Sequence, residues 1–512
     1  MHSLRPFTYL GDYINGTFVI PKEKSGTFES LNPGNLKDTL STFYTSFSHV
    51  HLATEAAKQA FPKWRALSQE ERAMYLKKFY KEIETHLDQM AELISRETGK
   101  PLWEAMQETQ GLLGKITITL EESAKLVGEK EVPNAQPKLM GRYRYKPKGV
   151  MLVLGPFNFP AHLPHGHIVP ALFTGNTVIF KPSEQTPAVG QFMAELIHRA
   201  QFPPGVFNLV QGEKEIGRRL CIEPGIDGIL FTGSYDVGLK IKESTLSHFW
   251  KTLVLEMGGK NASIVLDDAS LEKALYENIK GAYLTAGQRC SATSRLILTE
   301  KIADSFLKEF HRLSKELKIG YAFTEAPNAP FMGPLISQTA MDKYLRFQGI
   351  AQREGAEIIM RGKALELTPS GYYVSPSISL LSPKKDFATY LGTEIFGPNV
   401  AVTIVKNLDE AIEEANKTDY GLAVSVFTKD KKAYEKVFQE TKTGLVNWNR
   451  STVGGSSKLP FGGQGKSGNQ FPTALFAPFY CTYPVACLED REDFIQETIP
   501  PGLSLHGKNG KN

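Results

Sequence analysis

The sequence lacks several features that would quickly assign it to a class of protein. Its 512 residues include four cysteines, Cys221, Cys290, Cys481 and Cys487, and no two of them form a Cys-x-x-Cys pair. The spacing therefore indicates neither a disulfide framework nor a metal site, and it favours a reducing compartment. The net charge of +4 is small for this length, so we expect neither nucleic acid nor a membrane as the main partner.

Long apolar runs are also missing. The stretch from Met1 to Pro6 has no apolar core of the kind found in signal peptides, and runs such as 150–154 have the length of a buried strand. A cytoplasmic protein is therefore expected. What is present, 41% hydrophobic and 22% charged residues, is typical of a globular protein, and the length favours two or three domains.

The stretch from Glu256 to Cys290 carries residues suited to covalent chemistry. Glu256 ends the apolar run 252–255 and is soon followed by two glycines, a pattern typical of a strand that ends in a tight turn. Cys290 stands among small and polar residues after a helical segment. A cysteine thiolate is a strong nucleophile, but free cysteine is also among the most buried residue types. The pattern alone leaves both interpretations open.

Apolar strands alternate with helices from residue 149 onward. Strands are predicted at 150–154, 177–180, 206–210, 229–232 and 253–255. A second unit has strands at 263–266 and 295–299 around a helix at 270–285, and it continues to about residue 446. Such alternation indicates parallel sheets covered on both faces, which bind ligands beyond the carboxyl ends of their strands. Those ends carry Asn158, Lys181, Gly212, Gly233 and Glu256.

A Gly-x-Gly-x-x-Gly motif follows none of these strands. The turn 231–238 has small residues that would let backbone N–H groups approach a pyrophosphate, although ordinary turn chemistry explains the same residues.

The first 150 residues predict a different organisation. Asn15-Gly16 marks a hairpin, in a segment expected to cover a surface. Ser68 and Glu71 have the spacing of a capping box that opens one long helix to Gly99, and a second helix is expected from Pro101 to about residue 126. Residues 142–146 then alternate like an exposed strand.

Four motifs, in order along the chain, resemble those of the aldehyde dehydrogenase superfamily. They are Phe157-Asn158-Phe159-Pro160, Glu256-Met257-Gly258-Gly259-Lys260, Gly287-Gln288-Arg289-Cys290 and Glu394-Ile395-Phe396-Gly397-Pro398. The resemblance implies an α/β fold with two doubly wound parallel-sheet domains and a small β oligomerisation arm. The implied divisions are an NAD-binding domain at 1–128 and 148–257, a catalytic domain at 258–447, the arm at 129–147 and 474–490, a substrate-anchor loop region at 448–473 and a C-terminal tail at 491–512.

The same resemblance implies roles for individual residues. Cys290 would be the nucleophile, Glu256 the general base and Asn158 the donor that stabilises the oxyanion, with NAD as cofactor and no metal. Glu184 would favour NAD because a carboxylate repels the 2′-phosphate of NADP. Cofactor binding is expected at Phe157, Lys181, Glu184, Gly212, Gly217, Phe231, Gly233, Ser234, Val237, Gly238, Gly258, Glu394 and Phe396. Substrate binding is expected at Arg289, Ser291, Arg450, Gly454, Gly455 and Phe461.

Within the superfamily, segments 96–101, 155–172 and 444–449 are most similar to the succinylglutamate semialdehyde dehydrogenases of bacterial arginine catabolism. The chain departs from them at 468–472, where those enzymes usually carry a His-Arg pair, and Arg450 and Lys458 could supply the missing charge. Glutamate semialdehyde or another small aldehyde is the alternative substrate. An inactive scaffold and an esterase that uses Cys290 without a dinucleotide are the alternative functions.

A homo-oligomer, most simply a dimer, is expected through exposed strands at 142–146 and 479–488, because unpaired strands need a partner to cover them. This prediction places Cys481 and Cys487 in the interface between subunits.

Overall fold

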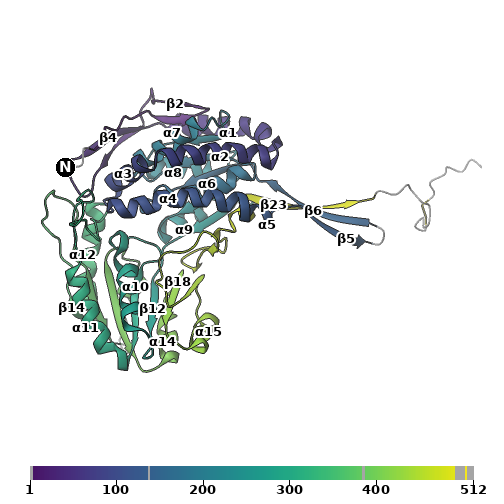
Figure 1. Ribbon diagram of the computed structural model, residues 1–512. Coiled ribbons are helices and arrows are strands. Elements are labelled where there is room, and N and C mark those ends of the chain that lie inside the picture. The colour runs from purple at the N-terminus through teal and green to yellow at the C-terminus, as the bar shows by residue number, and fades with distance from the viewer. Residues whose placement is uncertain (1–3, 137–138, 383–386, 491–501, 504–512) are drawn as a thin grey trace, which may run out of the picture.

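The computed structural model describes residues 4–136, 139–382, 387–490 and 502–503. The predicted tail at 491–512 lies outside the described residues except for 502–503, as do residues 137–138 of the predicted arm. Two α/β units are stacked on each other, and a narrow arm projects from the first of them (Figure 1).

The first unit is built on a seven-stranded sheet with the order β11-β10-β7-β8-β9-β1-β2. Five of its strands run parallel and confirm the five strands predicted between residues 150 and 256: β7 (Val150–Leu154), β8 (Thr177–Lys181), β9 (Phe207–Leu209), β10 (Gly228–Thr232) and β11 (Thr252–Glu256). Each is buried on both faces because alternate residues enter different cores. Met151 and Val153 lie in one hydrophobic cluster, and Val150 and Leu152 lie in the other.

Helices supply the residues that cover the two faces. The cluster with Met151 includes residues of α6 (His162–Phe173) and α7 (Pro187–Arg199). The cluster with Val150 includes residues of α1 (Phe47–Ala66), α8 (Lys214–Ile222) and α9 (Tyr235–Ser244). The sheet is therefore doubly wound, as predicted.

The N-terminal hairpin joins this sheet. β1 (Asp12–Ile14) pairs antiparallel with β9 and with β2 (Thr17–Val19), and the predicted turn residues Asn15 and Gly16 have φ of 51° and 85°. Tyr13 and Ile14 are buried. The expectation that this segment covers a surface was wrong for β1, which extends the sheet beyond β9. A second hairpin follows, β3 (Gly26–Leu31) with β4 (Thr39–Thr45).

The helices that precede the sheet differ in part from the prediction. The capping box at Ser68 and Glu71 is confirmed. The helix it opens, α2 (Gln69–Thr85), is separated from α3 (Leu87–Thr98) by the non-helical backbone of His86. The prediction of one long helix was therefore wrong. After Pro101 the chain forms α4 (Leu102–Ile118), a π-helical turn η1 (Thr119–Ser123) and α5 (Ala124–Leu126).

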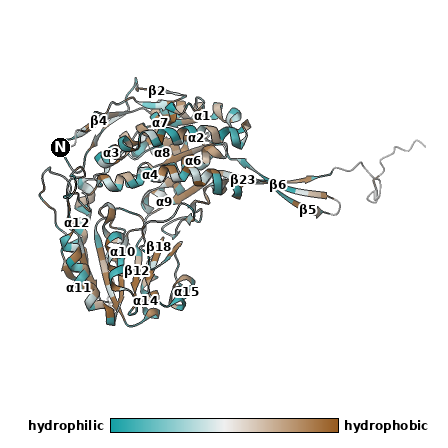
Figure 2. Ribbon diagram, viewed as in Figure 1, coloured by the Kyte–Doolittle hydropathy of each residue, from teal (hydrophilic) through white to brown (hydrophobic). Residues whose placement is uncertain are grey.

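The second unit has a seven-stranded sheet in the order β14-β15-β16-β13-β12-β18-β19, in which the edge strand β14 is antiparallel. The strands of this second sheet are coloured mainly as hydrophobic in Figure 2. Its strands are β12 (Asn261–Val265), β13 (Thr293–Thr299), β14 (Glu357–Met360), β15 (Ser377–Leu381), β16 (Asn399–Val405), β18 (Ala423–Phe427) and β19 (Leu445–Trp448). Its helices are α10 (Leu271–Tyr283), α11 (Glu300–Glu316), α12 (Gln338–Arg353), α13 (Ala388–Gly392), α14 (Leu408–Ala415) and α15 (Lys431–Glu440).

The arm is a three-stranded antiparallel sheet made of β5 (Lys130–Gln136), β6 (Leu139–Pro147) and β23 (Thr482–Glu489). The predicted strand at 479–488 begins later, because the chain before Thr482 forms the short helix α16 (Ala477–Cys481). Cys481 is fully buried in the core of the first unit. Its predicted place in a subunit interface was therefore wrong, whereas Cys487 does lie on the arm.

Candidate active site

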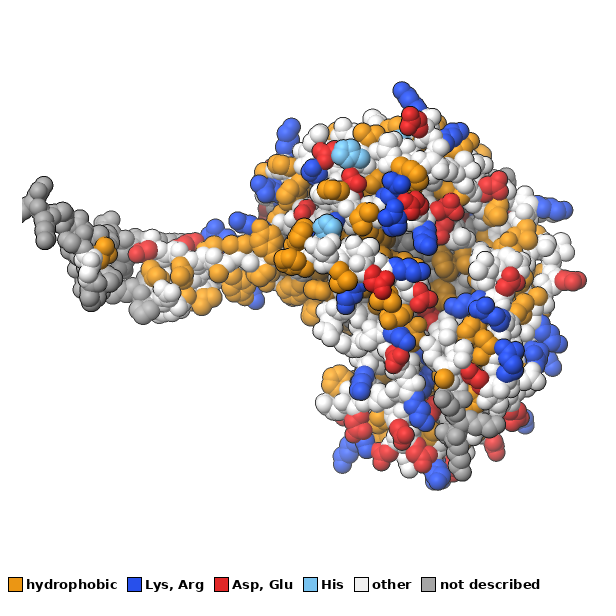
Figure 3. Space-filling view, turned by 180° about the vertical axis from the view of Figure 1, so that it is seen from behind, with side chains coloured by type: hydrophobic (Ala, Val, Ile, Leu, Met, Phe, Trp, Pro, Cys, Tyr) orange, Lys and Arg blue, Asp and Glu red, His pale blue; other side chains and the backbone are white. Residues whose placement is uncertain are grey.

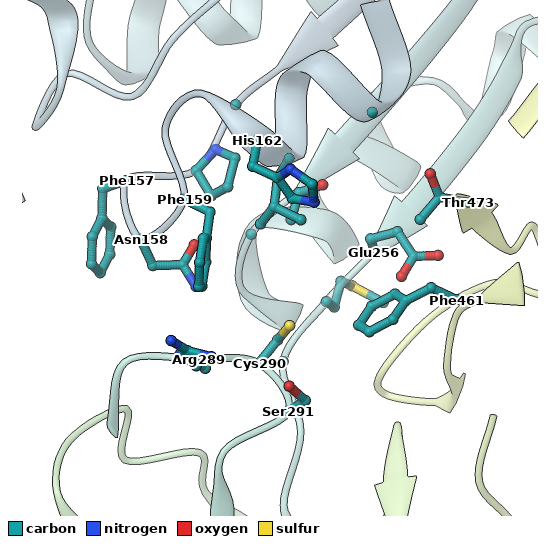
Figure 4. A pocket seen from close by; sticks show the side chains of 18 of the residues that line it. Phe157, Asn158, Phe159, His162, Glu256, Arg289, Cys290, Ser291, Phe461 and Thr473 are labelled. Atoms are coloured by element: carbon teal, nitrogen blue, oxygen red, sulfur yellow. The ribbon is translucent and has the colours of Figure 1, made fainter. Parts of the chain in front are cut away.

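The order in which the chain adds strands to the first sheet reverses between β7 and β10. The chain passes from β7 to β8 on one side and later adds β10 and β11 on the other, so a crevice opens beyond the carboxyl ends of β7 and β10. A cavity of about 580 Å³ lies there, lined by residues that follow β7, β10 and β11 together with the Cys290 loop of the second unit. Asn158, Glu256 and Cys290, which are far apart in the sequence, meet in this cavity (Figure 4).

Cys290 lies in a strained loop between α10 and β13. Thr285 and Ala286 have φ of 54° and 53°, in the left-handed region that non-glycine residues rarely adopt. Gly287 also has a positive φ, and a Cβ there would come within 2.3 Å of the Gly397 carbonyl oxygen. The surrounding structure must therefore hold this loop in place.

Glu104 of α4 holds the Cys290 loop in place. Its carboxylate accepts hydrogen bonds from the hydroxyl and the backbone N–H of Thr285, and it forms an ion pair with Arg289 at 2.6 Å. The Nε atom of Arg289 donates to the Thr285 hydroxyl at 2.9 Å. Arg289, which was predicted to bind substrate, lines the cavity. Its charge is neutralised by Glu104, and the ion pair helps to hold the Cys290 loop in place.

The thiol of Cys290 points into the cavity (Figure 4). Burial, together with the carboxylates of Glu394 and Glu256, raises the pKa of Cys290 to about 12. Without ligands the resting side chain is therefore a neutral thiol at physiological pH, and its ionisation requires a base or a change in its surroundings.

The Asn158 amide is fixed beside this loop. Its Nδ2 donates to the Gln288 carbonyl at 2.9 Å, and the backbone carbonyl of Asn158 accepts from the Nζ of Lys100 at 2.7 Å. Lys100 is paired in turn with Glu108 of α4 at 2.6 Å. These bonds fix the position of the Asn158 amide next to Cys290. A donor that is fixed in advance is what electrostatic stabilisation of an oxyanion requires.

Three buried charged residues of α4 did not stand out in the sequence. Glu104, Glu108 and Lys115 are all buried and lie on one face of the helix, since they are separated by four and seven positions. This spacing of charged residues on a predicted helix is a signal that could have marked them, because buried charges need partners.

Glu256 ends β11 with its side chain in the cavity. It is 5% exposed, and its Oε2 atom is buried without a hydrogen-bond partner among the described residues. Burial raises the pKa of this carboxyl well above its usual value. Figure 4 shows the carboxyl near Phe461 and Thr473, across the cavity from Cys290. An unpartnered carboxyl at this place can accept a proton from water that enters the cavity.

Most of the predicted cofactor residues line one end of the cavity. They are Phe157, Glu184, Phe231, Gly233, Ser234, Val237, Gly258, Glu394 and Phe396. The others lie just behind this wall. Lys181 donates to the Pro182 carbonyl at 2.7 Å and lies 3.6 Å from Glu184, and Gly217 faces its side chain. Gly238 packs on Met257, and Gly212 packs on Ile216. We call this end the nucleotide end.

The nucleotide end fits a dinucleotide. Ser234 caps α9, whose N-terminus faces the cavity, so backbone N–H groups are available to an anion. Glu394 is held by the Gly259 N–H at 2.9 Å, and a Cβ at Gly258 would come within 1.9 Å of its carboxylate. Burial raises the pKa of Glu394 to about 7. Lys343 of α12 also lines this end, and sequence reasoning missed it.

The opposite end, here called the loop end, is lined by the predicted Gly454, Gly455 and Phe461, and Ser291 stands next to Cys290. Arg450, also predicted to bind substrate, does not line the cavity. Its side chain is 67% exposed, and its guanidinium lies 3.9 Å from Glu277 outside the cavity. Lys458 is exposed as well and does not line the cavity. Lys115, His162 and Thr473 line this end instead, and none of them was predicted.

Two further properties hold for the residues that the structure describes. They contain no group of three or more His, Cys, Asp or Glu side chains placed to bind a metal ion. Within the same ranges, no helix is long and apolar enough to cross a membrane.

Comparison with known proteins identifies the family. The Aldehyde dehydrogenase family matches residues 20–474. Over 490 residues the chain is 39% identical to N-succinylglutamate 5-semialdehyde dehydrogenase of Legionella pneumophila (strain Corby), covering 96% of this chain and 97% of that protein.

Solved structures of similar fold support the same family. PnpE from Pseudomonas sp. WBC-3 has a TM-score of 0.88 at 31% identity, covering 94% of this chain and 98% of PnpE, and PnpE has also been solved in complex with nicotinamide adenine dinucleotide. An NADP-dependent enzyme of Escherichia coli has a TM-score of 0.87 at 29% identity, covering 94% of this chain and 98% of that one. With its motifs gathered around one cavity and the family match spanning most of its length, the chain belongs to the aldehyde dehydrogenase family.

Proposed function

We propose that this protein oxidises a semialdehyde that carries a carboxylate to the corresponding acid, with NAD as the oxidant. N-succinylglutamate semialdehyde, an intermediate of arginine catabolism, is the first candidate substrate because the relative that matches nearly the whole chain is named for it. The observation that carries the proposal is the meeting of Cys290, Asn158 and Glu256 between a nucleotide end and a separate loop end of one cavity.

The chemistry follows from these three side chains. The Cys290 thiolate adds to the aldehyde carbon and forms a C–S bond, and the oxyanion accepts hydrogen bonds from the Asn158 amide and the Cys290 backbone N–H. Loss of hydride leaves a thioester on Cys290. Glu256 then removes a proton from water, which attacks the thioester carbon and releases the acid and the thiolate. The reaction consumes one aldehyde, one NAD and one water, and it yields the acid, NADH and a proton.

NAD, when bound, supplies the acceptor for that hydride. The residues suited to hold it are those of the nucleotide end, with the N-terminus of α9 facing the pyrophosphate and Glu394 a ribose. Glu184, at the carboxyl end of β8, supports NAD over NADP because it would repel a 2′-phosphate. On this assignment NAD binds to residues 1–128 and 148–257, catalysis belongs to 258–447, and 448–473 anchor the substrate.

A panel of aldehydes tests the proposal. Purified protein with NAD should produce NADH fastest from N-succinylglutamate 5-semialdehyde, more slowly from glutamate 5-semialdehyde, and slowest from butanal. If glutamate semialdehyde were the best substrate, the alternative substrate would replace the first candidate. NADH from none of them would leave the inactive scaffold, and ester hydrolysis without NAD binding would support the esterase.

We further propose that the protein is a homodimer in a reducing, cytoplasmic setting, with four free thiols. The arm supports the dimer, because Val132, Tyr483 and Leu488 are large hydrophobic residues exposed on a projecting sheet. Hydrophobic side chains along the arm are seen in Figure 3. Light scattering should give twice the mass of one chain. A chain truncated before Thr482 that kept this mass would refute the role of the arm.

A further inference from the structure

The loop end of the cavity contains a buried cation without a counter-ion. Lys115 of α4 is 2% exposed and lines the cavity. Its Nζ atom donates one hydrogen bond, to the Ala474 carbonyl at 2.8 Å. No ion pair joins it to a carboxylate among the described residues. An ammonium has three donors, and burying one without an opposite charge costs several kcal/mol.

The ionisable groups around Lys115 do not supply a negative charge. They are His162, His165 and His167 of α6 and Cys481 of α16. Burial lowers the pKa values of the three histidines, so these are neutral near pH 7, and it raises that of Cys481, so the thiol stays protonated. Burial likewise lowers the pKa of Lys115 to about 8.

Two other buried lysines near the cavity have the counter-ion that Lys115 lacks. Lys100, buried at the start of the same helical region, is paired with Glu108 at 2.6 Å and also donates to the Asn158 carbonyl. Lys181 lies 3.6 Å from Glu184. Each of these two lysines is paired with a carboxylate of the protein, whereas the ammonium of Lys115 faces the cavity.

A glycine and a histidine of α6 border the cavity near Lys115. A Cβ on Gly166 of α6 would meet the Cε atom of Lys115 at 3.9 Å, so a larger side chain there would occupy the space beside the ammonium. His162 lies in the cavity wall, and its ring extends into the pocket above Cys290 (Figure 4). Its Nδ1 is buried toward Gly111 of α4 and has no hydrogen-bond partner among the described residues.

We propose that Lys115 binds a carboxylate of the substrate at the end remote from the aldehyde, with His162 as a second polar contact. This inference rests on the proposed function and specifies it: selection for an acidic aldehyde comes from a lysine on α4. The substrate carboxylate completes the ion pair that the protein leaves open, and the aldehyde carbon is thereby directed to Cys290. Arg450 and Lys458, which lie outside the cavity, take no part.

The test compares acidic and neutral aldehydes in Lys115→Met, which keeps the length of the side chain and removes its charge. For succinic semialdehyde and N-succinylglutamate 5-semialdehyde, kcat/KM should fall at least about 20-fold more than for butanal, mainly through KM, since a charged hydrogen bond is lost. Lys125→Met is the matched control, because Lys125 is 71% exposed on α5 and outside the cavity. It should leave the ratio between acidic and neutral substrates unchanged.

A purely structural role for Lys115, as a donor to Ala474, would lower kcat/KM for acidic and neutral aldehydes equally, and that result would overturn the inference. If Lys115→Met does not fold, Lys115→Gln is measured instead, and binding of glutarate to the wild-type protein without NAD is followed by calorimetry. Glutarate should bind more weakly above pH 8, as Lys115 loses its proton. Glutarate binding that neither weakens above pH 8 nor depends on Lys115 would also overturn it.

The outcome for the wild-type protein separates this inference from the proposed function. Wild-type protein that prefers butanal to both acidic aldehydes would refute the proposed substrate class itself. Wild-type protein that prefers the acidic aldehydes, with Lys115→Met keeping that preference in full, would refute the role of Lys115 alone.

Discussion

The two ends of the cavity are built in different ways. The nucleotide end consists largely of residues that directly follow β7, β10 and β11, so short turns at neighbouring strand ends form its wall. The loop end brings together α4, α6, the 454–457 loop and β22 (Thr473–Ala474). The hydrogen bond from Lys115 to Ala474 spans 359 positions of the sequence. Strand order therefore places most of the first end, whereas the second depends on packing between distant segments.

The three proposed catalytic residues lie where the two ends meet, so the largest effect is expected there. Cys290→Ser should lower kcat at least about 10⁴-fold, because a serine hydroxyl is hardly ionised at neutral pH. NAD binding at the nucleotide end should persist, as measured by calorimetry. Cys487→Ser on the arm is the control and should retain turnover. Near-full activity of Cys290→Ser would mean that another group is the nucleophile.

Glu256→Gln should separate the two chemical steps. Hydride loss precedes the water step, so rapid mixing should show a burst of about one NADH per site, followed by a steady state reduced about 10²- to 10⁴-fold. The amplitude of the burst is the decisive measurement. If burst and steady state were lost together, Glu256 would be needed earlier, to ionise Cys290.

Glu104→Gln tests whether α4 positions the nucleophile from a distance. The ion pair with Arg289 would be lost, the hydrogen bonds from Thr285 would no longer be accepted by a charged group, and the strained loop would shift. We expect kcat to fall about 10- to 100-fold, as for small misplacements of reacting groups, with KM for NAD nearly unchanged. Glu104→Asp keeps the charge and should retain more activity. A rise in KM for NAD as large as the fall in kcat would show a general disturbance of the fold instead.

The rate at which iodoacetamide alkylates Cys290 should depend steeply on pH. Because burial and two carboxylates raise the pKa of Cys290 to about 12, the thiolate fraction rises about tenfold per pH unit below that value. Alkylation between pH 7 and 9 should therefore accelerate about tenfold per unit without levelling off, as followed by mass spectrometry of the Cys290 peptide. A plateau near pH 7 would show that the resting cysteine is already a thiolate.

The smallest effect is expected from a change at Glu184, in the wall of the nucleotide end. Glu184 is 41% exposed, so water screens its charge. Glu184→Ala should narrow the preference for NAD over NADP about fivefold, measured as the ratio of the two kcat/KM values. The exposed Glu215→Ala on α8 is the control. A wild-type protein faster with NADP would contradict the assignment.

Much of this molecule could be predicted from local patterns. The five strands of the first sheet, the Asn15-Gly16 hairpin and the capping box at Ser68 all follow from periodicity and turn chemistry, and the structure contains them. The break at His86 and the helix before Thr482 were missed, because core packing rather than propensity decides where such elements end.

The sequence by itself determined the family, the strands of the first sheet along the chain and most residues of the nucleotide end, because motifs and strand ends are local and parallel sheets place strand ends side by side. Tertiary structure alone decided that Glu104 holds the Cys290 loop, that Arg450 stays outside the cavity and that Lys115 enters it. The physical reason is that a charged side chain is defined by its partners, and these partners come from segments that meet only when the chain is packed.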